Sequence, residues 1–209
     1  MALASPSRWR RRAQARPEEI LEAALAEFSE KGFEAARMED IARRAGISKA
    51  GVYLYFRSKE GLLTALIKAK VAPLAQQVRA MAAAGATDPL GALRRIASMA
   101  AHQLQDAKVL AVPRLVIAVS GRFPRIAEDY RREVAEVARG ALIELIEAAI
   151  EQGRIRAVDP VAAARAFIGP LFFEGMWTHV LRGESAEGGP GRLIDSHFDI
   201  LLNGLEHRA

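Results

Sequence analysis

Residues 38–63 read MEDIARRAGISKAGVYLYFRSKEGLL, and they carry the strongest structural signal in the chain. Gly46 stands between two short apolar runs, at a place where a tight turn with a positive φ would favour glycine. Ala42 is small enough to let two helices approach closely. The apolar positions that would pack these helices together recur at helical spacing; they are Ile41, Ala45, Ile47, Val52 and Tyr55. The stretch therefore predicts a helix-turn-helix.

The second helix of this pair, expected at about 49–56, has an unusual composition. Two of the three tyrosines of the chain, Tyr53 and Tyr55, lie in it, and lysines stand near both of its ends. Ser48 is placed to cap its N-terminus, because a serine hydroxyl can accept a hydrogen bond from a backbone N–H two or three residues further on. Ser58 is placed in the same way before a fourth helix. Both ends of the helix are thus predicted from short-range signals.

The rest of the sequence is helical in pattern. Residues 17–31 place their apolar side chains on one helical face, Pro17 suits the first helical position, and Gly32 ends the segment. Alanine-rich segments follow, without an alternating strand pattern; we expect helices at about 59–81, 89–106, 109–119, 124–151, 160–182 and 192–206. The sequence predicts an all-α protein, with an N-terminal three-helix helix-turn-helix domain and a larger helical domain.

Charge is distributed unevenly along the chain, whose formal net charge is +5. Residues 1–70 hold 14 Lys and Arg against 9 Asp and Glu, and the remaining residues hold 16 of each. The excess therefore lies in the first third, as expected when one end of a protein meets a polyanion such as nucleic acid. A solubilising tail is the alternative, because five of these cations lie in residues 1–16.

Several classes of function are disfavoured by what the sequence lacks. The chain has no cysteine, which excludes disulfides, thiolate metal sites and a cysteine nucleophile. It has no uninterrupted apolar run of about 18 residues, so we expect no membrane span and a cytoplasmic location. Asp195, His197 and Asp199 lie close together in the sequence, but no second histidine stands at a ligand spacing and no nucleophile motif is present. We therefore expect no enzyme, no metal and no cofactor.

The run RMEDIARRAGISKAGVYLYFRSKEGLL (37–63) resembles the DNA-binding domain of the TetR/AcrR (tetracycline-repressor) family of bacterial transcription regulators. A weaker resemblance to the family's variable ligand-binding and dimerisation domain continues through 114–134 and the last two helices. The resemblance implies a homodimer that, in most members, is a repressor released from double-stranded DNA by a small molecule. It also implies a division into three parts: a basic flexible arm (1–16), a helix-turn-helix DNA-binding domain (17–67) and a ligand-binding and dimerisation domain (68–209).

The family's DNA contacts can be carried over to matching positions, with the third helix in the major groove. The positions that would face bases or the groove are Lys49, Ala50, Tyr53 and Leu54. The positions that would face phosphates are Ser48, Gly51, Tyr55 and Lys59. Lysine can donate to guanine acceptors, small apolar groups can meet a thymine methyl, and hydroxyl groups can donate to phosphate oxygens.

The chain departs from the family pattern in two places. Ala50 and Gly51 stand where the family often has glycine and threonine, so a phosphate-binding hydroxyl is absent there. Arg37 stands where many members have a threonine that caps the second helix and contacts phosphate; its charge could still reach phosphate. The arginine-rich arm resembles extensions that enter an adjacent minor groove, with a merely soluble tail as the alternative.

In the larger domain, the resemblance implies that the last two helices pair with their symmetry mates. The interface candidates are Phe167, Leu171, Trp177, Leu193, His197, Phe198 and Leu201. From the residues alone, these apolar faces could equally form an intramolecular core. The candidates for a pocket that holds a small-molecule inducer are Met99, His102, Gln103, Arg114, Phe123, Phe173 and Met176.

The resulting hypothesis is a dimeric repressor of a palindromic operator that a ligand releases. The alternative is a DNA-binding dimer without an inducer, acting as a ligand-independent repressor or an architectural protein. Thermal stabilisation by a small molecule that also weakens operator binding would distinguish the two.

Overall fold

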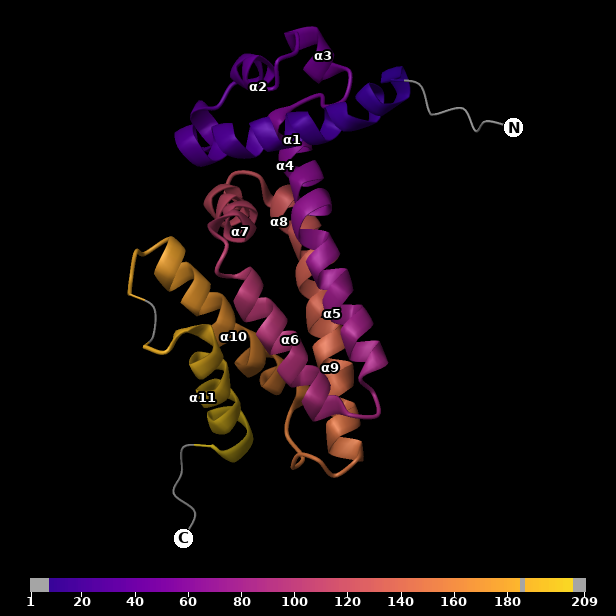
Figure 1. Ribbon diagram of the computed structural model, residues 1–209, viewed down its shortest axis with the longest axis vertical. Helices are drawn as coiled ribbons and strands as arrows, with labels where there is room; N and C mark the ends of the chain where they lie inside the picture. The colour runs from indigo at the N-terminus through magenta and orange to yellow at the C-terminus, as the bar shows by residue number, and fades with distance from the viewer. Residues whose placement is uncertain (1–7, 185–186, 205–209) are drawn as a thin grey trace, which may run out of the picture. The chain divides into compact units, whose positions relative to one another are not determined.

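The computed structural model describes residues 8–184 and 187–204, with side chains from Pro17 onward except that of Pro190. Over these residues the chain is built of helices without a strand, which confirms the predicted all-α class (Figure 1). Residues 1–7 of the predicted arm lie outside the described residues, and 8–16 belong to the first helix.

The helical elements run from the first turn of α1 to the end of α11. They are α1 (Arg8–Ala35), α2 (Met38–Arg44), α3 (Lys49–Tyr53), α4 (Lys59–Leu66), the π-helical η1 (Ile67–Val71), α5 (Ala72–Ala84), α6 (Pro89–Gln103), α7 (Ala107–Val119), α8 (Pro124–Tyr130), the π-helical η2 (Arg131–Ala135), α9 (Glu136–Glu151), α10 (Pro160–His179) and α11 (Gly189–Asn203).

Contacts divide the chain into two compact units. The first unit holds the chain up to Ala69 together with Ala111–Asp129, and the second holds Lys70–Leu110 and the chain from Tyr130 onward. The segment Ala111–Asp129 falls in the sequence range that we assigned to the second domain. It groups with the first unit because its side chains pack there, as in the edge-to-face contact between Phe123 and Phe33, whose ring centroids lie 5.5 Å apart.

In the first unit, α1 packs against α2 and α4, and α2 packs against α3. The apolar face that the sequence predicts for 17–31 is buried, with Ile20, Ala24 and Phe28 at successive turns of α1. Gly32 has φ +79° and ψ 159°, so it interrupts the helix where the sequence predicts its end. A residue with a Cβ would be strained at this φ, because the left-handed region favours glycine.

A cluster of ion pairs ties α1 to α2. The carboxylate of Glu27 is 5% exposed and lies 2.8 Å from Lys31 Nζ and 2.9 Å from Arg44 Nε. Arg44 also donates from Nη1 to Glu30 at 2.8 Å, and Lys31 lies 3.2 Å from Asp40. Because Arg44 and Asp40 belong to α2 and the other three residues to α1, the cluster fixes how these two helices cross.

The pKa of Glu27 lies below its ordinary value, chiefly because Lys31 and also Arg44 stabilise the carboxylate, although burial acts in the opposite direction. A carboxylate with a lowered folded-state pKa contributes stability above its unfolded pKa of about 4.3, and this contribution is lost as the pH falls through the folded value. Glu27→Gln should therefore lower the free energy of unfolding by about 2 kcal/mol at neutral pH, since it removes the buried partner of two half-exposed cations.

Thermal unfolding from pH 7 to pH 3 checks this prediction. The difference between the wild type and Glu27→Gln should shrink as the pH falls. Glu30→Gln is the matched control, because its carboxylate belongs to the same cluster but is 55% exposed. A difference between the wild type and Glu27→Gln that stays constant down to pH 3 would contradict the assignment.

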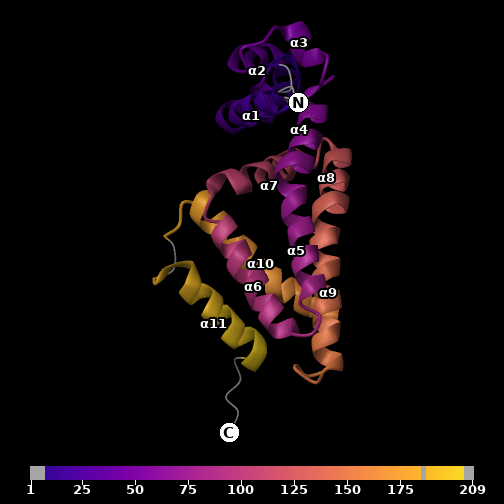
Figure 2. The same cartoon turned by 45° about the vertical axis from the view of Figure 1, so that its right-hand side comes forward.

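The second unit is a helical body in which α5 and α9 lie side by side and α6 packs on both (Figures 1 and 2). α10 packs against α9 and α6, and α11 packs against α6 and α10. Its core is formed mainly by large aliphatic and aromatic side chains, among them Leu93, Ile96, Leu142, Leu145, Phe167 and Phe198. This unit carries the interface candidates and five of the seven pocket candidates.

Two of the expected helices contain π-helical segments. The one expected at 59–81 is interrupted by η1, and the one expected at 124–151 is interrupted by η2. The chain passes between the units inside η1, after Ala69, and again just before η2, after Asp129. π-Helical segments of this kind are often found at functional sites.

Candidate nucleic-acid interface and ligand pocket

The turn between α2 and α3 has the backbone that the sequence predicts. Gly46 has φ +66°, and the N–H of Ile47 donates to the carbonyl of Ala42 at 3.0 Å. The hydroxyl of Ser48 accepts from the N–H of Gly51 at 3.1 Å, which confirms the predicted cap of α3. Ser58 caps α4 in the same way, by accepting from the N–H of Gly61 at 3.2 Å.

The side chains of α3 divide between the core and the surface. Val52 is completely buried and anchors the helix to the unit. The helix ends at Tyr53, earlier than the expected 56; Tyr53 is 42% exposed, and Leu54 and Tyr55, which follow it, are 84% and 43% exposed. Lys49 and Ala50 are exposed as well, so the structure brings together on the surface the residues that the sequence places at the groove.

Lys49 is held by a partner that sequence reasoning missed. Its ammonium forms an ion pair with Glu39 in the first turn of α2 and lies 5.9 Å from the centre of the Tyr53 ring. The Glu39 carboxylate raises the pKa of Lys49, and Lys49 in turn lowers the pKa of Glu39. Glu39 and Lys49 are ten positions apart, and the turn at Gly46 between the two helices brings them together.

Lys59 also has a role within the first unit. Its ammonium donates to the carbonyls of Phe33 and Glu34, at 2.7 and 2.9 Å, and lies 5.0 Å from the centre of the Phe33 ring. A lysine is unfavourable at the N-terminus of its own helix α4 but favourable at the C-terminal end of α1, where the last carbonyls need donors. One of its three N–H groups is left for an anion.

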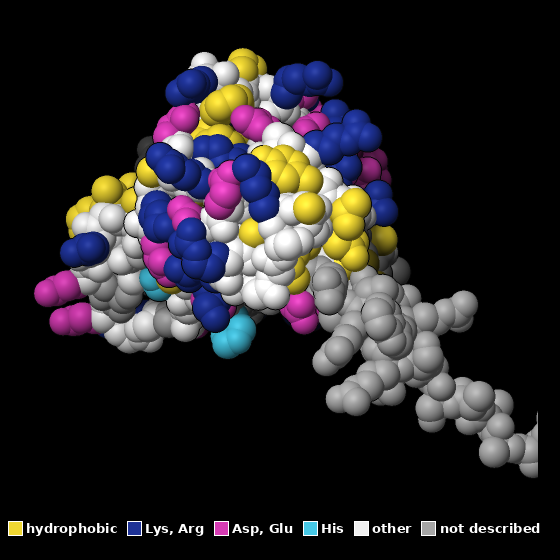
Figure 3. All heavy atoms as spheres, turned by 90° about the horizontal axis from the view of Figure 1, so that it is seen from above, with side chains coloured by type: hydrophobic (Ala, Val, Ile, Leu, Met, Phe, Trp, Pro, Cys, Tyr) yellow, Lys and Arg dark blue, Asp and Glu magenta, His cyan; other side chains and the backbone are white. Residues whose placement is uncertain are grey.

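The other predicted DNA contacts are placed as follows. Arg37 is the N-cap residue of α2, with an exposed side chain that makes no capping hydrogen bond. Gly51 is half-buried, and a Cβ there would lie 3.3 Å from the Ser48 hydroxyl, so glycine leaves room for the cap. Seen from the α2–α3 side, basic side chains stand out on the surface and acidic ones lie close beside several of them (Figure 3).

The interface candidates do not lie on one surface. Phe167, Leu171 and Phe198 are buried in the core of the second unit. His197 is 9% exposed, and its Nε2 donates to the carbonyl of Phe167 at 3.0 Å. Leu193 and Leu201 are half-buried, and Trp177 is 41% exposed.

A set of apolar side chains that shares only Trp177 with the candidates is exposed on α10 and near its end. They are Val161, Ile168, Phe173, Trp177 and Leu181. Phe173 is 60% exposed and stacks on Trp177, with the ring centroids 6.2 Å apart. Because α10 also buries the opposite side, it is apolar nearly all round, which is typical of a helix covered on both faces.

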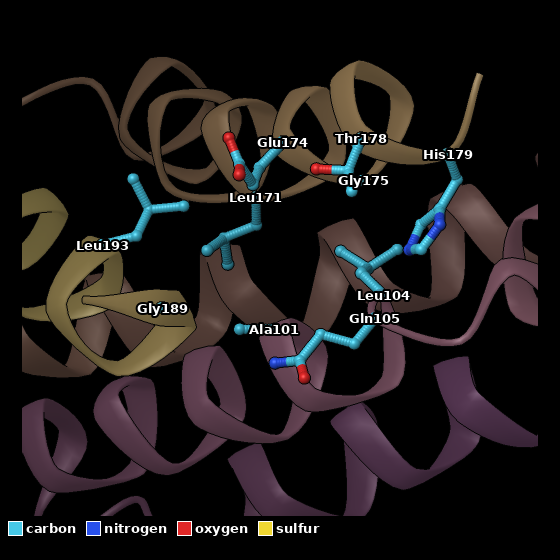
Figure 4. Close-up of a pocket in the computed structure, with 10 residues that line it drawn as sticks. All are labelled: Ala101, Leu104, Gln105, Leu171, Glu174, Gly175, Thr178, His179, Gly189 and Leu193. Atoms are coloured by element: carbon cyan, nitrogen blue, oxygen red, sulfur yellow. The ribbon is translucent and has the colours of Figure 1, made fainter. Parts of the chain in front are cut away.

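The second unit contains a cavity of about 390 Å³ between α6, α10 and the start of α11 (Figure 4). Its lining is mainly apolar, with a few polar groups; it consists of Ala101, Leu104, Gln105, Leu171, Glu174, Gly175, Thr178, His179, Gly189 and Leu193. Gly175 allows close packing here, because a Cβ would lie 2.9 Å from a methyl group of Leu110. A volume above 300 Å³ and such a lining are typical of small-molecule sites.

None of the seven pocket candidates is among these lining residues. Arg114 and Phe123 belong to the first unit, where Phe123 contacts Phe33. His102 is exposed, Gln103 and Met176 are half-buried, Met99 packs against the core, and Phe173 lies on the exposed side of α10. The candidates on α6 are sequence neighbours of the lining residues but point elsewhere.

The acidic residues around His197 have separate partners. Asp195 lies 2.9 Å from Arg94, and Asp199 accepts from the side chain of Asn203 at 2.8 Å. In the part of the chain that the structure describes, no cluster of three or more His, Asp or Glu side chains is arranged to hold a metal. Within the same part, none of the helices combines the length and the apolar character that crossing a membrane requires.

A capped helix-turn-helix with an exposed second helix, carried by an all-helical chain, defines a DNA-binding protein of the helix-turn-helix class. Residues 20–66 match the family described as bacterial regulatory proteins, tetR family, and residues 91–189 match the AefR-like transcriptional repressor C-terminal domain. Together the matches span well over half of the chain. The chain belongs to the TetR family and is a transcriptional regulator, not an enzyme.

Individual relatives agree with this assignment. The uncharacterized HTH-type regulator YfiR of Bacillus subtilis is 47% identical over 53 residues, which cover 25% of this chain and only about a quarter (26%) of YfiR. The fatty acid metabolism regulator protein of the same organism is 24% identical over 93% of this chain and 99% of its own length. The structure of Bacillus subtilis FadR in complex with stearoyl-CoA has the same fold, with a TM-score of 0.66 at 18% identity over 90% of this chain and 99% of FadR.

Proposed function

We propose that the protein is a repressor that binds a palindromic DNA operator as a homodimer and is released by a small molecule. The observation that carries the proposal is the exposed surface of α3 and the two residues after it, where Tyr53, Leu54 and Tyr55 surround the buried anchor Val52. Exposed aromatic and apolar side chains gain no burial on a free protein. They would be covered when the helix enters a major groove. Such a regulator acts where the chromosome lies, in the cytoplasm.

On DNA, some side chains of α3 and the residues after it contact bases, and others contact the phosphate backbone. Lys49 donates to guanine, and Ala50 and Leu54 meet thymine methyl groups. The hydroxyl of Tyr55 donates to a phosphate oxygen, and that of Tyr53, which the resemblance places at the groove, reaches a phosphate oxygen at the groove edge; both fix the register of the helix. Further phosphate contacts come from Ser48, Gly51, Lys59 and Arg37.

Dimerisation uses the exposed apolar side of α10, and not the buried positions among the candidates. Phe173 and Trp177 form its centre, since they are stacked, exposed and aromatic, as interface anchors commonly are. A two-fold dimer would present two copies of α3 to half-sites 34–36 Å apart or a multiple of that distance.

Release by a ligand is a shift between two conformations. A ligand in the second unit favours the one in which the two α3 helices no longer match adjacent half-sites. The transmitter is the continuous run of α4, η1 and α5, which joins the units. A relative of the same fold has been solved with stearoyl-CoA, which supports a ligand-binding role for the helical body.

Selection of duplex DNA from a random library by the full-length protein tests the proposal. We expect an enriched palindrome with two half-sites, bound by a particle of twice the monomer mass. If no sequence is enriched over the input, the repressor proposal is wrong. Operator binding that no added small molecule changes would favour the ligand-independent alternative.

Glu39→Gln should increase affinity for non-specific duplex DNA by roughly three- to tenfold, because it frees Lys49 and removes a negative charge from the face that meets phosphates. The slope of log K against log salt should become steeper by about 1 for each protomer. Fluorescence anisotropy with a random duplex between 50 and 200 mM salt measures both effects.

The matched control is Glu136→Gln, which removes a similarly exposed carboxylate paired with Arg131 in the second unit. Its salt slope should equal that of the wild type. Equal slopes for Glu39→Gln and the wild type would mean that Glu39 does not compete with DNA for Lys49.

A further inference from the structure

One charged side chain interrupts the most apolar stretch of α10. Residues 166–180 read AFIGPLFFEGMWTHV, and Glu174 is their only Asp, Glu, Lys or Arg. This carboxylate lines the cavity between α6, α10 and α11 and is half-buried. A carboxylate in a mainly apolar lining can form a charge-assisted hydrogen bond with a cationic donor. Glu174 therefore offers a negative charge to an occupant of the cavity.

The protein does not supply a partner for this carboxylate within the described residues. No hydrogen bond or ion pair joins a described residue to the Glu174 carboxylate, whereas many other acids of the chain are paired, for example Glu39 with Lys49 and Asp195 with Arg94. The other polar side chains of the lining are those of Gln105, Thr178 and His179, and no Lys or Arg is among the lining residues. The cavity thus carries one formal negative charge and no positive charge.

In the lining of the cavity, leucines lie on both sides of the polar groups. Glu174 and Thr178 stand one helical turn apart on α10, Ala101 approaches from α6, and Gln105 approaches from the segment that follows α6 (Figure 4). Leu193 closes one side from α11, and Leu104 lies on the other side, next to His179. An occupant would therefore place an apolar body among leucines and a donor group beside Glu174.

A second cavity of the same unit has the opposite charge. It has a volume of about 590 Å³ and lies between the end of α9, the start of α10 and the end of α11. Arg154 and Arg156 line it, with Asp159 as its only acidic residue. The negative sign at Glu174 is therefore a property of one cavity, not of the whole second unit.

We propose that the cavity at Glu174 binds an amphipathic cation, an apolar amine whose ammonium group pairs with Glu174 while its hydrocarbon part packs against Leu104, Leu171 and Leu193. The inference deepens the ligand-release step of the proposed function and rests on it for its regulatory meaning. It differs from the ligand in the stearoyl-CoA complex of the relative, because CoA is an anion.

Isothermal titration of the full-length protein with octylamine, octanoate and octanol tests the proposal, because the three share a chain length and differ in headgroup charge. At pH 7 the ammonium compound should bind roughly tenfold or more tightly than octanol, since a charge-assisted hydrogen bond in a partly dry site is strong. Equal or tighter binding of octanoate in the wild type, or no binding of octylamine, would overturn the proposal.

Glu174→Gln is the decisive variant, because it keeps the shape of the side chain and removes its charge. It should weaken octylamine binding by roughly tenfold and leave octanol binding unchanged. Glu144→Gln, an exposed carboxylate on α9, controls for net charge and should bind like the wild type. Octylamine binding that survives in Glu174→Gln would show that the amine binds elsewhere.

The titration is independent of DNA, so the two proposals can fail separately. Failure to select an operator would refute the repressor proposal without changing the titration. Failure of octylamine to bind at Glu174 would refute the ligand assignment while operator binding remained intact.

Discussion

Replacing Tyr53 with alanine should weaken operator binding by roughly a hundredfold while the protein stays folded and dimeric. A hydrogen bond to a charged group contributes about 1.5–3 kcal/mol, and a dimer would lose one at each half-site. A total near 3 kcal/mol corresponds to a factor of about one hundred. Tyr53 is 42% exposed, and its ring lies 5.9 Å from the Lys49 ammonium, so the fold should tolerate its removal.

Fluorescence anisotropy with the selected operator measures this loss, and circular dichroism with sedimentation confirms fold and mass. Tyr53→Phe removes the hydroxyl and keeps the ring. If the phenol donates to phosphate, this variant should show most of the loss of operator affinity seen in Tyr53→Ala. Wild-type affinity in Tyr53→Ala would mean that α3 meets DNA with another face.

Lys59→Ala tests the proposed DNA-binding surface less specifically than Tyr53→Ala. Its ammonium donates to the carbonyls of Phe33 and Glu34, so the variant would leave the C-terminal end of α1 without two donors. Reduced DNA binding in that variant could arise from a displaced α1. For this reason the groove face is better tested at Tyr53.

Phe167→Ala should lower the free energy of unfolding by about 3–5 kcal/mol, because it empties a fully buried position. The ring packs edge-on against Phe198, with the centroids 5.9 Å apart, and its own carbonyl accepts from His197. The sequence nominated Phe167 for the dimer interface, whereas the packing of the second unit gives it a core role. The expected loss should shift the melting temperature by roughly 10 °C.

Phe173→Ala, the same substitution one and a half turns along α10, is the matched comparison. Its side chain is 60% exposed, so the monomer should lose little stability. If this side of α10 is the dimer contact, the dissociation constant of the dimer should rise at least roughly tenfold, because each dimer loses two aromatic anchors. Sedimentation at several concentrations measures the dissociation constant. If Phe173→Ala lost stability and Phe167→Ala lost dimerisation instead, Phe173 would be the core residue and Phe167 the interface residue.

Local signals made most of the first unit predictable. The turn at Gly46, the caps at Ser48 and Ser58 and the interruption at Gly32 each depend on a few neighbouring residues. Backbone strain and capping hydrogen bonds act over three or four positions, so these turns and helix ends can be predicted from the sequence alone. The exposed face of α3 follows from the same periodicity once Val52 is taken as its anchor.

The larger domain was harder to predict because its helices offer more than one apolar face. On α10, Phe167 and Leu171 turn inward while Phe173 and Trp177 turn outward, and the sequence shows all four simply as apolar. The ligand candidates failed to coincide with the cavity for a related reason. For the five candidates of the second unit, a rotation of one or two residues decides which side chains reach a cavity, whereas Arg114 and Phe123 group with the first unit.

Sequence alone established the helix-turn-helix, the all-helical class and the concentration of positive charge near the N-terminus, since these depend on local pattern and composition. Tertiary structure decided which partner each charged or apolar group meets: Glu39 for Lys49, the α1 carbonyls for Lys59 and Phe198 for Phe167. The physical reason is distance along the chain. Such contacts join residues that lie from 10 to 31 positions apart, and only packing brings them together.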